Sequence, residues 1–167
     1  MTLSACMWTK SAKERWMNFY QVYIVSLVAR AFGSVSSQAE ILRWASEGAG
    51  RDLACYTRLL GMEAFDVEDA LALLNAATGL ADNLKVSDKG STLEVKVHKS
   101  SCRMCPGLLN GGGQPTPKCP IYGLVKGFLE GQEVVKLEYD GSEPRDRGEW
   151  CILRYKVREP PATTQQK

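Results

Sequence analysis

The sequence predicts an α/β domain of the α+β kind, in which an N-terminal layer of helices packs on an antiparallel sheet. In the first half of the chain, apolar residues recur every three or four positions, a spacing typical of amphipathic helices. From residue 84 onward, apolar and polar residues alternate, as they do in half-buried strands. A chain of 167 residues is long enough for one domain that folds without disulfides.

Three helices are expected before the period changes, over residues 12–32, 36–61 and 66–79. Each is expected to end at a glycine, the residue that most readily adopts the left-handed conformation closing a helix. The start of the third is the best defined, because Asp66 precedes Asp69 at the spacing of a capping arrangement.

The second half predicts a hairpin, a helix and two further strands. The hairpin strands, 84–86 and 93–97, flank a turn at 88–90. The later helix runs from Pro120 to Gly131, since proline is favoured in the first turn. The last strands are 133–139 and 150–157, separated by a polar hairpin segment. We therefore expect one domain over residues 1–158, mainly helical over 1–90 and carrying the sheet and a metal site over 91–158, with a disordered tail at 159–167.

Charge and hydropathy exclude several classes of partner. The 21 basic and 19 acidic residues give a net charge of +2, which predicts neither nucleic-acid binding nor a membrane-surface partner. The longest apolar stretch falls well short of the roughly 20 residues of a membrane span. Charged residues interrupt the N-terminus where a signal peptide would need a continuous apolar run. We expect a soluble, cytoplasmic protein with reduced cysteines.

Four cysteines in the last part of the chain indicate a metal site: Cys102, Cys105, Cys119 and Cys151. A C-x2-C pair can hold one ion with two thiolates, and two distant cysteines can complete a four-sulfur site. Cys119 precedes the late helix, where backbone N–H groups and the helix dipole are expected to lower its pKa. Zinc is the first expectation. An iron–sulfur cluster is the alternative, because Cys-Pro occurs twice, at 105–106 and 119–120.

Two other interpretations of the cysteines remain open, namely buried unpaired thiols and disulfides in an exported protein. Cys55 stands apart from the cluster in sequence, on a helical face where a small buried apolar residue is expected. The only histidine, His98, could replace one cysteine as a ligand, act as a general base, or lie exposed at a strand end.

The stretch Cys-Pro-Ile-Tyr-Gly-Leu-Val-Lys-Gly-Phe-Leu at 119–129 and the stretch Gly-Glu-Trp-Cys-Ile-Leu at 148–153 resemble motifs of the four-vinyl reductase domain family. This family, also called hydrocarbon-binding proteins, shares its fold with small TRAPP tethering subunits. The resemblance covers roughly residues 19–157. It implies dimerisation through helices, and we expect a homodimer.

The resemblance also implies a ligand set for the metal. Cys119 and Cys151 match the family's first and last ligands, and Glu138 falls near its glutamate. Gly141 stands where the family has a further cysteine, so Cys102 and Cys105 are expected to replace the absent ligands.

Members of that family bind small apolar or aromatic molecules between helices and sheet. By analogy, four side chains could line such a pocket, and the alternative for each is core packing. These are Trp44, Tyr56, Phe65 and His98.

The sequence therefore favours a zinc-binding domain that binds or senses a small apolar molecule and has no catalytic residue of its own. One alternative is an iron–sulfur redox protein or reductase partner. The other is a dimeric interaction or scaffold subunit akin to the tethering proteins, which would have a filled interior and a large apolar surface. No nucleotide-binding motif is present, and the sequence leaves open whether any reaction is catalysed.

Overall fold

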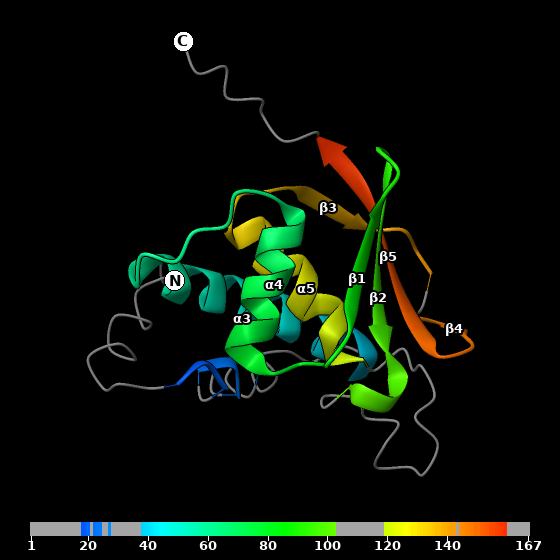
Figure 1. Ribbon diagram of the computed structural model, residues 1–167, viewed down its shortest axis with the longest axis horizontal. Helices are drawn as coiled ribbons and strands as arrows, with labels where there is room; N and C mark the ends of the chain where they lie inside the picture. Colours follow the sequence, from blue (N-terminus) through cyan, green and yellow to red (C-terminus); the bar gives the residue numbers. More distant parts are fainter. Residues whose placement is uncertain are drawn as a thin grey trace.

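The protein is described by a computed structural model over residues 18–20, 22–24, 27, 38–102, 119–142 and 144–159. Three helices lie on one side of an antiparallel sheet (Figure 1). The elements are α3 (Gln38–Leu59), α4 (Val67–Thr78), β1 (Leu84–Asp88), β2 (Thr92–His98), the short 3-10 helix η1 (Lys99–Ser101), α5 (Pro120–Gly131), β3 (Lys136–Tyr139), β4 (Arg145–Arg147) and β5 (Trp150–Glu159). This confirms the expected α+β class.

The first predicted helix lies largely outside the described residues. Its described positions, 19, 20, 22–24 and 27, are all helical. Val22 and Tyr23 are buried in the core, whereas Tyr20 is 56% exposed. The helix is therefore confirmed at these positions, but its buried face differs from the predicted apolar stripe, which included Tyr20 and left out Val22.

Local capping explains why α4 begins and ends where it was predicted to. The Asp66 carboxylate accepts a 2.8 Å hydrogen bond from the Asp69 backbone N–H, which would otherwise have no partner in the first turn. At the other end Gly79 adopts a left-handed conformation with φ of 61° and donates its N–H to the Asn75 carbonyl. Both ends are set by residues within the segment itself.

The sheet has the strand order β1-β2-β5-β3, and β4 also pairs with β5. In the register of β2 and β5, Val97 lies opposite Cys151 and Val95 opposite Leu153. These residues face the helices, since they belong to the core or pack against it. The short strand β4 was missed in the sequence, where its segment was expected to be a polar hairpin loop.

Glycines bring α3 and α5 into backbone contact. A Cβ atom added at Gly127 would lie 1.9 Å from the Glu47 carbonyl oxygen, and one added at Gly123 would lie 2.4 Å from the Arg43 carbonyl oxygen. On the facing helix, a Cβ at Gly50 would lie 2.4 Å from the Leu124 carbonyl oxygen. Only residues without a side chain permit this approach.

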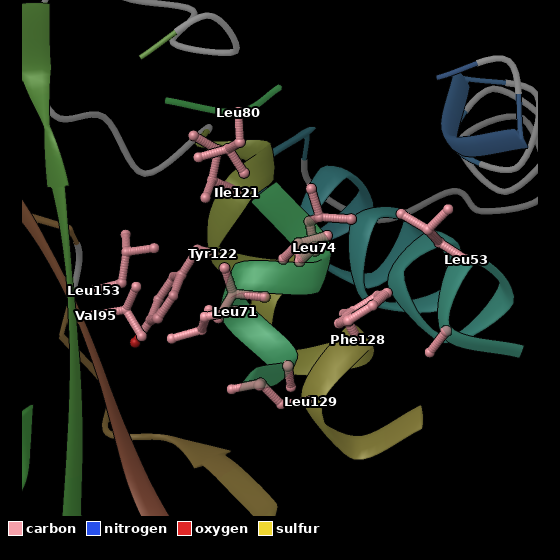
Figure 2. Packing of buried hydrophobic residues seen from close by; sticks show 14 of the residues in the cluster. Leu53, Leu71, Leu74, Leu80, Val95, Ile121, Tyr122, Phe128, Leu129 and Leu153 are labelled. Carbon is pink, nitrogen blue, oxygen red and sulfur yellow. The ribbon is translucent and has the colours of Figure 1, made fainter. Parts of the chain in front are cut away.

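The core fills the space between these helices and the sheet. Figure 2 shows Tyr122 of α5 beside Leu153 and Val95 of the sheet, and Leu71 of α4 close by. Tyr122, Tyr155 and Phe128 are the largest fully buried side chains. Within the described part of the chain, no helix is both long and apolar enough to cross a membrane.

Candidate functional site

Three of the four predicted metal ligands lie on three different elements. Cys102 is the residue that follows η1, Cys119 is the N-cap of α5, and Cys151 is the second residue of β5. The fourth, Cys105, lies outside the described residues. Cys102 and Cys119 are buried in the main core, and the half-buried Cys151 packs against it.

Backbone contacts place Cys102 near the turn that precedes Cys151. The Lys99 N–H donates a 2.9 Å hydrogen bond to the Glu149 carbonyl, which fastens η1 to the turn ahead of β5. The Cys102 N–H donates to the Lys99 carbonyl at 3.4 Å and so places Cys102 beside that turn. Cys151 lies on the helix-facing side of β5, as do Leu153 and Tyr155. We define Cys102, Cys119 and Cys151 as the thiol cluster.

The electrostatics at Cys119 differ from the prediction. Burial raises the pKa of the Cys119 thiol well above its ordinary value, and the neighbouring Cys151 and Cys102 raise it further. Hydrogen bonds from the Ile121 and Tyr122 backbone N–H groups act in the opposite direction but do not compensate. The expected lowering of this pKa at the helix start was therefore wrong, because desolvation outweighs the helix terminus.

The structure gives no support to a preformed metal site. Among residues 38–102, 119–142 and 144–159 and the few described positions of the first helix, no group of three or more His, Cys, Asp or Glu side chains is arranged to hold an ion. The three thiols are close enough to interact electrostatically. They are not gathered around a common point.

Two other predicted ligands lie elsewhere. Glu138 of β3 is paired with Lys156 and so lies on the face of the sheet opposite to that of Cys151, where it forms an ion pair with Arg158. His98 is half-buried at the end of β2, with its ring 5.1 Å from the Trp150 ring and its Nε2 3.9 Å from Glu149.

The residues predicted to line an apolar pocket occupy separate settings. Trp44 is 53% exposed on α3, and Phe65 is 93% exposed ahead of α4. Tyr56 is buried, and its ring meets that of Phe19 edge-on at 5.8 Å. Together with His98 at the far end of β2, these residues do not share one cavity. Of these four residues, Tyr56 alone is packed in the core, as the alternative interpretation expected.

Cys55 also differs from the expectation of a small buried apolar residue. It is half-buried on α3 and forms a disulfide. No pairing of this residue was predicted from the sequence, in which cysteines were expected to stay reduced.

A second site, missed in the sequence, is a charged groove of about 760 Å³ between α3, α5 and β3. At its base Lys126 Nζ donates to Glu47 Oε1 at 2.8 Å and to both Glu130 carboxylate oxygens at 3.0 Å. Arg51 also pairs with both glutamates, and the Tyr139 hydroxyl donates to Glu47 Oε2 at 2.9 Å.

We call Glu47, Arg51, Lys126, Glu130 and Tyr139 the charged network. Its members form ion pairs and hydrogen bonds with one another. Glu130 also accepts a hydrogen bond from the Leu137 backbone N–H at 3.0 Å. Although burial acts to raise the pKa of Glu130, hydrogen bonds from Arg51, Leu137 and Lys126 hold it below its ordinary value. The sequence signal was an i,i+4 pair on each helix, 47 with 51 and 126 with 130, but nothing in the sequence paired the two helices.

The fold defines an α+β domain in which Cys102 and Cys151 lie near the N-terminus of α5. Residues 37–157, well over half of the chain, match the model of the MJ0207 family, and the chain belongs to this family. Neither the curated proteins nor the solved structures contain a match.

The family match overturns the resemblance to the four-vinyl reductase domain and, with it, to TRAPP subunits. The stretch that suggested it, with glycines at 123 and 127, is accounted for by the close contact of α5 with α3. Any helix pair with backbone contact needs such glycines, so the spacing does not distinguish one family from another.

Proposed function

We propose that the thiol cluster is a metal-thiolate site and that the domain is a non-catalytic metal-binding module, with zinc as the expected ion. The observation that carries this proposal is that Cys102 and Cys151, from two other elements, lie near enough to Cys119 to act on its thiol electrostatically. Three neighbouring thiolates repel one another, and a divalent cation offsets that repulsion.

Metal binding on this proposal is coupled to a local rearrangement. Four sulfur ligands at about 2.3 Å from zinc define a tetrahedral site, and the thiols of the cluster are not yet in that arrangement. Cys105 is the proposed fourth ligand because of its C-x2-C spacing from Cys102. Closing the site would fasten η1, α5 and β5 to one another.

An iron–sulfur cluster on the same four sulfurs is the alternative occupant, as Cys-Pro at 119–120 keeps this interpretation open. The homodimer and the small apolar or aromatic ligand were implied by the overturned resemblance, and neither forms part of this proposal. A cytoplasmic location is proposed because thiolate ligands require a reducing compartment, although Cys55 is in a disulfide.

A role in protein interaction is the second candidate function. It is favoured by the filled interior, in which Tyr122 and Tyr155 occupy the space between α5 and the sheet and Phe128 is also fully buried. The grooves along α4 and β1 and over α3 and α5 are open and partly polar. A domain of this kind presents surfaces to partners and encloses no ligand there.

The metal content of anaerobically purified protein, measured with its visible spectrum, tests the proposal. About one zinc per chain and no colour are expected, and Cys119→Ser and Cys151→Ser should each lower zinc retention by at least tenfold. Thr78→Ser is the control, since it keeps the hydroxyl that donates to the Leu74 carbonyl on α4, outside the cluster, and should leave the zinc content unchanged. Iron with sulfide would establish the cluster alternative, and absence of any metal would exclude both.

A further inference from the structure

A continuous groove runs between α4 and β1. It consists of two adjoining hollows of about 520 and 570 Å³, which share Glu68 and Val86 in their linings. The floor is apolar and includes the buried Leu71 and the half-buried Leu84, with the exposed Ala72 beside them. We call this feature the α4–β1 groove.

The outer edge of β1 pairs with no described strand, since β1 ends the strand order. The His98 N–H donates to the Asn83 carbonyl at 3.1 Å, and the Lys89 N–H donates to the Thr92 carbonyl at 2.9 Å. The backbone N–H and C=O groups of the odd-numbered residues along β1 therefore point toward β2. Because the pattern alternates in an antiparallel pair, Leu84, Val86 and Asp88 direct theirs outward.

Carboxylates dominate the rim of the groove. Two lie at the ends of β1, Asp82 just before the strand and Asp88 as its last residue. The other three are Asp66, Glu68 and Glu133. Among these, Glu133 pairs with Arg58 at 2.7 Å, and the described lining residues include more carboxylates than cations.

Lys85, the one cation among the described lining residues, points away from these carboxylates. It lies opposite Lys96, on the face of the sheet away from the helices, and its Nζ is 4.8 Å from the centre of the Trp150 ring. At the end of the groove nearest the start of α4, the Phe65 ring is 93% exposed. The groove thus combines an open strand edge, an apolar floor and an acidic rim.

We propose that the α4–β1 groove binds an extended segment of a partner protein, which adds to β1 as a further strand. Its groove-facing side chains are β-branched or aliphatic in the middle, over Leu71 and Ala72, and basic at both ends, next to Asp82 and Glu68. Backbone hydrogen bonds to an open edge supply affinity in such complexes, and alternate side chains supply specificity. A second copy of this chain is disfavoured because it would place one acidic rim against another.

The probe is the peptide fluorescein-Gly-Gly-Arg-Thr-Val-Thr-Arg-amide, labelled at its N-terminus, with alternate side chains matched to the groove. Fluorescence anisotropy on the full chain is expected to show saturable binding that weakens with salt. Replacing both arginines of the peptide by glutamate should weaken binding at least tenfold. Methylating the backbone nitrogens on one edge of the peptide should do the same, because this removes the donors needed for strand pairing.

Two variants of the protein separate charge from strand addition. Glu68→Lys should weaken binding about tenfold, whereas Glu40→Lys, its matched control in the exposed first turn of α3, should not. Val86→Pro removes an outward N–H that β2 does not use, so the sheet tolerates it and peptide binding is lost. Val86→Thr keeps that N–H and retains binding.

Equal binding of the acidic peptide, or equal effects of Glu40→Lys and Glu68→Lys, would overturn the charge argument. Full binding of the methylated peptide would overturn strand addition, and this result does not depend on how any variant folds. Sedimentation that shows a dimer lost in Val86→Pro would replace the proposed partner by a second copy.

Discussion

The ammonium group of Lys126 lies 2.8 Å from Glu47 Oε1, although these residues are 79 positions apart in the sequence. Both side chains are largely withdrawn from solvent, at 8% and 15% exposure. The pair joins α5 to α3 next to the glycines that let the two backbones meet. A charge in this position can be tolerated only with all its partners present.

Lys126→Ala is expected to lower the free energy of unfolding by about 3 kcal/mol, because it leaves Glu47 and Glu130 close together without their shared cation. Urea denaturation measures this difference. Arg58→Ala, which removes an exposed pair with Glu133, should cost at most about 1 kcal/mol. Equal effects of the two substitutions would show that the charged network is no more than a surface feature.

Gly127→Ala gives opposite expectations from helix propensity and from packing. Propensity alone predicts a gain of about 1 kcal/mol for alanine in a helix. Contact with the Glu47 carbonyl, 1.9 Å from the added Cβ, predicts a loss of more than about 3 kcal/mol as α3 is forced away.

Gly90→Ala serves as the control for Gly127→Ala. An added Cβ there meets nothing within 4 Å, and only its φ of 77° opposes the change, for a loss of about 1–2 kcal/mol. Thermal unfolding monitored by circular dichroism ranks the two variants. A stabilised Gly127→Ala protein would contradict the backbone contact.

The Glu94 carboxylate should contribute stability that disappears in acid. Hydrogen bonds from Arg154, at 3.1 and 2.5 Å, are the main cause holding the pKa of Glu94 below its ordinary value of 4.5, and Lys89 also lowers it. A carboxylate with a lowered pKa in the folded state stabilises the fold above its unfolded pKa, and this stability is lost as the pH falls through the folded value.

Glu94→Gln should therefore be less stable than the parent protein at pH 7, and the difference should shrink progressively below about pH 4.5. Unfolding free energies measured between pH 3 and pH 7 test this. Arg154→Gln removes the main cause of the lowered pKa of Glu94. The loss of unfolding free energy in acid that is due to Glu94 should therefore be smaller in this variant. A difference that stays constant with pH would exclude the linkage.

Removal of the metal tests the thiol cluster by a route independent of metal content. If Cys102, Cys119 and Cys151 bind zinc, a strong chelator should lower the midpoint of thermal unfolding of the parent protein by several degrees. The same chelator should leave the midpoint of Cys119→Ser unchanged. An equal response from both proteins would place the ion elsewhere.

A structural feature could be predicted from the sequence where contacts within one segment determine it, and could not where contacts between distant segments do. Residues Asp66 and Gly79 set the ends of α4 by contacts within the segment, so its boundaries could be predicted. Strand β4, with three residues, exists through its pairing with β5, and no local signal marks it. The pKa of Cys119 could not be predicted, because burial cannot be deduced from a position at a helix start.

The charged network also depends on contacts between distant segments, which the sequence does not indicate. An i,i+4 pair on each helix was visible, yet the partner of Lys126 depended on how α3 and α5 cross. The glycines at 123 and 127 were noticed as a motif and led to a wrong family, since their role becomes clear only when the facing backbone is in place.

The backbone contact between α3 and α5 has a consequence for the order of assembly. Its two sides are separated in the chain by α4 and the hairpin of β1 and β2, so closing this contact requires a long loop to form first. During synthesis α3 leaves the ribosome well before α5 exists. Until residues 120–131 have been synthesised, the surface of α3 around Gly50 has no helix to pack against. The interior of the N-terminal half therefore stays open to solvent during that time.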